Sequence, residues 1–287
     1  MAVVVNTNIS SLTASRILTE NRGDLERAME RLASGKRINS AKDDAAGMAV
    51  SAKMRAEIRS LNQAVRNTND AISLVSTYDG AAQEIEAALI RMRELAVQVK
   101  NGTYEEADRT NANYEYSALK TEITRIASVS SFNRVTLAQG STSLTGGTGA
   151  STTSFNFYVG SDPVKNGNTI TFGAQALDLG QTVSGGLKDI LSQGNAGSAA
   201  IAVDEALTKL AQARADAGAM VNRLEHTVSN LMNVSQNLSE AVSAIEDTDY
   251  AAESANLARA TVLAQAGTAM LAQANQSPNY ILTLLRQ

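Results

Sequence analysis

Cysteine and tryptophan are absent from this chain of 287 residues, and aromatic residues make up only 4% of it. Without cysteine there can be no disulfide, no thiolate metal ligand and no cysteine nucleophile. The burial of apolar surface must therefore rest on Ala, Leu, Ile, Val and Met, a composition that suits helices packed on helices. Only two prolines are present, Pro163 and Pro278, so long stretches exist in which no helix needs to break.

The chain also lacks a basic excess, and its first residues do not resemble a secretory leader. Its net charge is −4 and no basic stripe is visible, which argues against nucleic-acid binding. The start, MAVVVNTNIS, has no basic region and only a short apolar run, so we expect no cleaved signal peptide. The uncharged C-terminal stretch is long enough to cross a bilayer. Its Gln265, Gln273 and Asn275 would need hydrogen-bond partners in hydrocarbon, so we expect no membrane span.

What the sequence does contain is heptad spacing in two long segments. The spacing predicts a helix from Ala45 to Lys100, ended by Asn101-Gly102, and a shorter helix over 104–128. A stricter repeat runs from Val203 to Ile245, and two such segments most simply pack antiparallel. The predicted seam consists of Ile58, Leu61, Val65, Ile72, Val75 and Leu89 in the first segment, and of Leu207, Leu210, Val221, Leu224, Val228, Leu231, Leu238, Val242 and Ile245 in the second.

A segment of different composition separates the two helical parts. The run 140-GSTSLTGGTGASTTS-154 is too rich in glycine for a helix, whereas residues 155–159 alternate as a strand does and can pair with residues 169–172. We expect a small β-rich knob at the far end of the helical rod, with a poor core of its own. The predicted fold is therefore mainly α: a long antiparallel coiled-coil or helix-bundle rod formed by the N- and C-terminal thirds, with a small β-rich inserted outer domain.

Both ends of the chain are free of side-chain charge, over residues 2–15 and over the 26 residues 260–285. Antiparallel rods bring these ends together, and short helices gain most of their stability from packing. We therefore expect the ends to be buried among copies of the chain, through head-to-tail contacts that build rings or open filaments. The residues predicted to pack in this polymer core are Val5, Ile9, Leu12, Leu263, Gly267, Met270, Ala274, Leu284 and Leu285.

Four blocks of sequence resemble bacterial flagellin. They are VNTNI at 5–9, RLASGKRINSAKDDAAGMAVSAKMRAEIRSL at 31–61, LIRMRELAVQ at 89–98 and AQAGTAMLAQANQSPNYILTLLRQ at 264–287. The resemblance implies a structural subunit, without enzyme activity or cofactor, that self-assembles into the extracellular flagellar filament, the propeller for swimming. It implies an inner filament-core domain from 1–42 and 248–287, a surrounding rod domain from 43–137 and 198–247, and an outward-pointing insert at 138–197.

The resemblance also implies partners. Subunits of this family leave the cell unfolded through the flagellar type III export channel, bound beforehand by an export chaperone at the C-terminal region, and meet cap and junction proteins outside. Many members are sensed by a host innate immune receptor. The matching positions here are Ile90, Arg91, Leu95, Gln98 and Glu115; Ile90 stands where receptor-active members commonly have Gln. The alternative interpretation of this block is packing within the rod.

Three other functions are weighed against the filament subunit. An enzyme would need a partnered base, but the single histidine, His226, has no partner pattern, and the neighbouring carboxylates Asp43-Asp44 point apart on a helix. A hook–filament junction protein would share the terminal architecture, although the long match at both ends favours the filament subunit. The insert of a flagellin-like surface protein could also bind a ligand or carry glycans on its Ser and Thr residues.

Overall fold

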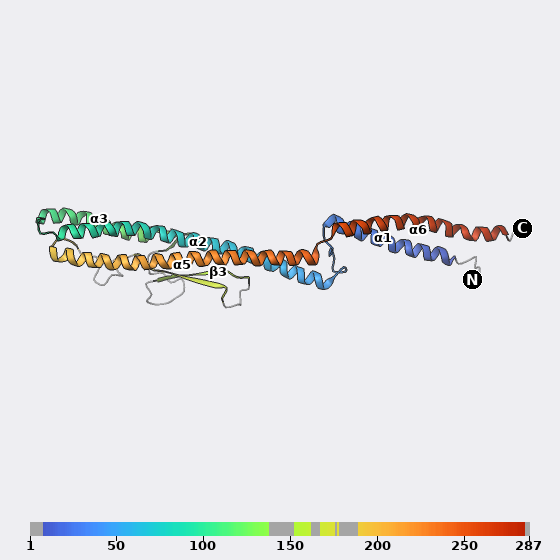
Figure 1. The fold of residues 1–287 in the computed structure, drawn as a ribbon, viewed down its shortest axis with the longest axis horizontal. Helices are drawn as coiled ribbons and strands as arrows, with labels where there is room; N and C mark the ends of the chain where they lie inside the picture. Colours follow the sequence, from blue (N-terminus) through green and yellow to red (C-terminus); the bar gives the residue numbers. More distant parts are fainter. Residues whose placement is uncertain (1–7, 138–151, 162–166, 176, 178–188, 285–287) are drawn as a thin grey trace. The chain divides into compact units, whose positions relative to one another are not determined.

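The computed structural model describes residues 8–137, 152–161, 167–175, 177 and 189–284. Helices account for most of them: α1 (Ile9–Ser34), α2 (Ala45–Lys100), α3 (Glu106–Val129), α5 (Gln193–Glu246) and α6 (Tyr250–Leu284). The strands are β1 (Ser131–Phe132), β2 (Val135–Thr136), β3 (Thr152–Tyr158) and β4 (Thr169–Gln175). The predicted mainly α fold with a small β-rich insert is confirmed (Figure 1).

The chain divides into two compact units. Unit 1 comprises Met1–Ile58 and Gln236–Gln287, and unit 2 comprises Arg59–Ser235. Helices α2 and α5 each contribute to both units, because each is far longer than one unit requires. These units are defined by contacts within the chain, and the domain limits at 42/43 and 247/248 that the resemblance implies stay a prediction.

Unit 2 is built on α2, α3 and α5, which lie side by side (Figure 1). Its main core is a cluster of apolar side chains to which all three helices contribute, among them Leu89, Met92, Ile123 and Leu210. Ion pairs flank the core between α2 and α5: Arg93 Nε lies 2.5 Å from Asp204 Oδ1, and Arg214 Nε lies 2.9 Å from Asp79 Oδ1. Thr68, fully buried at a seam position, donates its hydroxyl to the Ala64 carbonyl at 2.7 Å.

The side chains of the predicted seam residues are all buried or half-buried. Leu61, Val75, Leu89, Leu210 and Leu224 are buried, and the others are half-buried: Ile58, Val65, Ile72, Leu207, Val221, Val228, Leu231, Leu238, Val242 and Ile245. The buried stripe of α2 is wider than the predicted seam, because Leu74, Tyr78 and Ile85 are buried as well. A helix that contacts more than one neighbour must bury more than the narrow stripe of a two-stranded coiled coil.

Strands β3 and β4 form the expected antiparallel hairpin, with Phe155 opposite Phe172. The expectation of a separate knob at the far end of the rod was wrong. The hairpin lies along the helices of unit 2, and its apolar face packs on them: the rings of Phe172 and Tyr78 of α2 meet edge to face at 5.6 Å between centroids. Ile170 and Val159 pack with Leu224 of α5. A short hairpin cannot support a core alone, so it shares the core of the helices.

A second, shorter hairpin was not predicted. Strand β1 pairs with β2 directly after α3, and both turn residues, Asn133 and Arg134, have positive φ angles of 49° and 67°. This is the left-handed pair that a two-residue hairpin turn requires, and asparagine tolerates it better than most residues. The turn reverses the chain before it enters the insert.

Candidate assembly surface

The candidate functional surface lies on α1 and α6 of unit 1. Helix α1 is capped at its start by Asn8, whose side chain accepts a hydrogen bond from the Ser11 amide at 3.1 Å. It is capped at its end by Gly35, which adopts the left-handed conformation with φ of 70°. Helix α6 begins after Asp249, whose Oδ1 accepts from the amides of Ala251 and Ala252 at 2.9 and 3.2 Å. Both helices therefore have well-defined starts.

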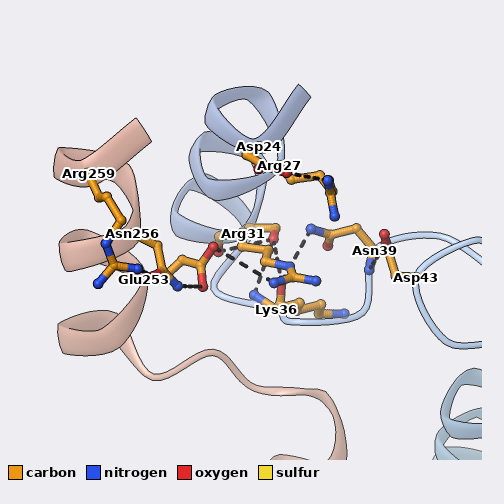
Figure 2. Close-up of polar contacts among 10 residues, drawn as sticks. Asp24, Arg27, Arg31, Lys36, Asn39, Asp43, Glu253, Asn256 and Arg259 are labelled. Atoms are coloured by element: carbon orange, nitrogen blue, oxygen red, sulfur yellow. Dashed lines mark hydrogen bonds and ion pairs between the residues drawn. The ribbon is translucent and has the colours of Figure 1, made fainter. Parts of the chain in front are cut away.

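The two helices run antiparallel to each other (Figure 1). At one end, Asn8 Nδ2 donates to the Ala274 carbonyl and Ser11 Oγ to Asn275 Oδ1, both at 2.7 Å. At the other end, Arg31 of α1 faces Glu253 of α6 with 3.8 Å between the charged atoms (Figure 2). The charge-free parts of the N- and C-terminal thirds are thus adjacent in space, as antiparallel packing requires.

Small residues allow the close approach of α1 and α6. Ala28 and Ala260 are buried between the helices, and a Cβ atom on Gly267 would lie only 3.2 Å from the Leu18 Cδ1 atom. Leu18 and Ala28 are the buried residues of α1. A 26-residue helix that buries two side chains gains little from its partner helix, so the pair alone removes only a small apolar area from water.

Much of the apolar surface of the pair remains exposed. Ile9, Leu12 and Met270 expose 67%, 63% and 65% of their surface, and Ile17, Val262 and Leu263 are exposed as well. Of the other residues predicted for the polymer core, Gly267 and Ala274 are half-buried. Val5 and Leu285 lie outside the described residues, as does the side chain of Leu284. Exposed apolar side chains in chain segments without charge are typical of a protein interaction site.

At the base of the helix pair, the connections of unit 1 are held by a buried carboxylate. Glu246, 5% exposed at the end of α5, pairs with Lys36 and Arg55, each at 3.1 Å. The Arg37 amide donates to the Glu246 carbonyl at 2.6 Å, and the Thr248 amide donates to the Gly35 carbonyl at 3.0 Å. The two connecting segments are therefore pinned to each other, which fixes where α1 and α6 start and end.

The sequence block considered for receptor recognition lies on unit 2. The exposed side chain of Arg91 donates to Glu115 of α3 at 2.7 Å and to Glu94 at 3.0 Å. These hydrogen bonds raise the pKa of Arg91, and the bond from Arg91 lowers the pKa of Glu115. Ile90 and Gln98 are exposed as well. Leu95 differs from expectation: at 2% exposed it packs in the helical core and offers no surface to a partner.

Other kinds of site find no support in the described part of the chain. No group of three or more His, Asp or Glu side chains there is arranged to hold a metal ion. None of the helices in the ranges described is apolar over enough length to cross a membrane. His226 is exposed on α5.

Long paired helices, close-packed small residues and an apolar, charge-free surface at the two ends of the chain define a structural protein built for self-association. Residues 5–143 match the bacterial flagellin N-terminal helical region, and residues 201–285 match the bacterial flagellin C-terminal helical region. The chain belongs to the bacterial flagellin family. It is therefore a structural subunit of the flagellar filament, an extracellular appendage, and not an enzyme.

Full-length relatives agree with this. The chain is 42% identical to a flagellin of Halalkalibacterium halodurans, over 99% of this chain and all of the relative. It is also 42% identical to a flagellar filament core protein of Brachyspira hyodysenteriae, again over 99% of this chain and all of the relative. A solved structure of a candidate flagellar hook-associated protein from Vibrio parahaemolyticus shares the fold, with a TM-score of 0.58 and 14% identity over 71% of this chain and all of the other.

Proposed function

We propose that the chain polymerises through the charge-free surface of α1 and α6, with residues 1–42 and 248–287 as the filament core. The observation that supports this is the exposure of Ile9, Leu12 and Met270 on a helix pair that buries little by itself. Apolar surface gains about 25 cal/mol for each Å² removed from water, so burying this surface among other copies is the main driving force that unit 1 can offer.

Residues 43–137 and 198–247 then form the surrounding rod domain, and residues 138–197 the outer insert. The seam residues hold the rod domain together and leave its charged faces in solvent, where residues such as Lys53 and Glu57 are exposed. A subunit whose chain ends, over 2–15 and 260–285, carry no charge while its rod is charged favours one orientation in the assembly, with the uncharged ends inward. Such head-to-tail stacking of identical copies generates an open filament.

A matched pair of substitutions tests this. Met270→Glu places a charge on the proposed core surface, and Met232→Glu places one on α5 of unit 2; both methionines are exposed, at 65% and 54%. Neither change should alter the helicity or the melting temperature of the monomer. We expect Met270→Glu to prevent elongation from filament seeds, because the charge would be buried without a partner, and Met232→Glu to elongate normally. Normal filaments from Met270→Glu would refute the proposal.

The same surface suggests how the subunit is handled before assembly. We propose that an export chaperone covers the C-terminal region in the cytoplasm, because exposed residues such as Val262 and Met270 would otherwise promote aggregation. Export through the type III channel without a cleaved signal peptide, and contact with cap and junction proteins outside, complete this proposal. If Met270→Glu bound the chaperone as tightly as the native chain does, the surface proposed for the chaperone would be wrong.

Recognition by a host innate immune receptor is a second proposal, for the exposed residues Ile90, Arg91, Gln98 and Glu115. The inter-helix pair of Arg91 and Glu115 presents a charged, ordered surface across α2 and α3. Arg91→Ala should reduce receptor signalling by the monomer. The matched control is Arg125→Ala, which removes another exposed arginine of the rod, one paired with Glu122 on its own helix. Equal signalling by both variants would argue against this surface.

A further inference from the structure

A polar cavity of about 190 Å³ lies between α1 and α6, within unit 1. Its lining repeats the same spacing on both helices: Asn21, Asp24, Arg27, Ala28 and Arg31 on α1, and Glu253, Asn256, Arg259, Ala260 and Leu263 on α6. In each helix the alanine is buried, and the other lining side chains are polar or charged except for Leu263. The cavity is thus a feature of the helix pair as a whole.

The charges of this cavity do not balance. Asp24 pairs with Arg27 on the same helix, and Glu253 pairs with Arg31 across the two helices (Figure 2). Among the described residues, Arg259 has no carboxylate within 4 Å; its guanidinium donates to the Asn256 side-chain oxygen at 3.3 Å. The cavity therefore holds three arginines against two carboxylates, with Arg259 left over.

A carboxylate pair without partners lies on the other side of α1. Glu26 and Glu30 are exposed, and neither forms an ion pair with any residue that the structure describes. They stand two residues before and two residues after Ala28, so at 3.6 residues per turn each lies about 160° round the helix from the cavity floor. Being one turn apart, the two carboxylates share one face of α1 and can approach a single cation together.

We propose that Arg259 in this cavity receives Glu26 and Glu30 from a second copy of the chain, an inference that rests on the proposed burial of α1 and α6 in the filament. An isolated charge is costly to bury unless it is paired. Arg259 and the two glutamates lie in the same helix pair and carry opposite charge. Because the cavity and the carboxylates are different surfaces, their contact is head-to-tail and propagates from copy to copy.

Charge swapping tests the contact without relying on a single defective variant. Arg259→Glu would place a carboxylate opposite Glu26 and Glu30, and the double variant Glu26→Lys, Glu30→Lys would place lysines opposite Arg259. We expect each variant alone to raise the critical concentration for seeded elongation by roughly tenfold, a size typical of close charge pairs at interfaces. In an equimolar mixture, copies of the two variants alternate and every contact is again complementary, so elongation should return to near the native value.

The controls separate this inference from the proposed function. Each variant must retain native helicity as a monomer, and Arg223→Glu, on an exposed arginine of α5 that pairs with no carboxylate among the described residues, should elongate normally. Suppose that Met270→Glu fails to elongate whereas Arg259→Glu elongates as the native chain does. The ion-pair contact would then be wrong, and the proposed core surface of α1 and α6 would stand. A mixture that elongates as poorly as its two components would likewise overturn the contact.

Discussion

Replacing Phe172 by alanine tests whether the β3–β4 hairpin belongs to the helical core. Phe172 is 2% exposed and meets Tyr78, 1% exposed, edge to face at 5.6 Å. Truncating a fully buried phenylalanine costs about 3–5 kcal/mol through lost burial and the cavity left behind, and the aromatic pair accounts for about 0.5–1.5 kcal/mol of that. At about 2–4 °C for each kcal/mol in a unit of this size, we expect the melting temperature to fall by roughly 6–20 °C.

The assay is urea and thermal unfolding of the monomer, followed by the helical circular dichroism signal. Helices α2, α3 and α5 contribute most of that signal, so its main transition responds to Phe172→Ala only if the hairpin and these helices unfold together. Thr171→Ala is the control: Thr171 is the exposed neighbour on the opposite face of β4, and its hydroxyl bonds Asn156 Oδ1 at 2.8 Å. We expect Thr171→Ala to lower the free energy of unfolding by less than about 1 kcal/mol. Unchanged helix unfolding in Phe172→Ala would refute the shared core.

Two further substitutions probe buried polar groups. Burial, with a smaller contribution from Asp189, raises the pKa of Tyr116 to about 12, and its hydroxyl has no hydrogen-bond partner among the described residues. Because the fold favours the protonated phenol, ionisation of Tyr116 takes nothing from stability below pH 10, and stability falls as the pH rises from 10 through about 12. Tyr116→Phe should raise the free energy of unfolding by about 1 kcal/mol at neutral pH. It should also flatten the fall in this free energy between pH 10 and 12, measured by urea unfolding. An unchanged alkaline profile would contradict this. Glu246→Gln leaves Lys36 and Arg55 without their shared carboxylate and should destabilise unit 1 by about 1–3 kcal/mol, measured as faster proteolysis at residues 35–44. Glu225→Gln, on an exposed residue, is the control and should change nothing.

The helices were largely predictable because their signals are local. Heptad spacing and the Asn101-Gly102 stop placed α2 at Ala45–Lys100, the bounds that the structure has. Alternation likewise indicated the pairing of residues 155–159 with 169–172. The position of the hairpin was not predictable, because periodicity does not say which of Tyr78, Ile85 or Leu89 faces a third helix and which faces a strand.

The polar cavity was missed for a related reason. Arg27, Arg31 and Arg259 look like ordinary surface charges in the sequence, and only the antiparallel register of α1 and α6 brings them together. A signal was present: the spacing of Asn21, Asp24, Arg27, Ala28 and Arg31 is repeated from Glu253 to Leu263. This repeat indicates a shared cavity only once it is known that the two segments pack face to face.

Amide hydrogen exchange, compared between dilute monomer and filament, addresses polymerisation through the neutral ends most directly. Residues 9–15 and 260–275 should exchange quickly in the monomer, because their helices bury few side chains, and should become strongly protected in the filament. Residues 74–99 of α2, already buried in unit 2, should change little on polymerisation. Full protection of both terminal segments in the dilute monomer, with no gain in the filament, would contradict the account.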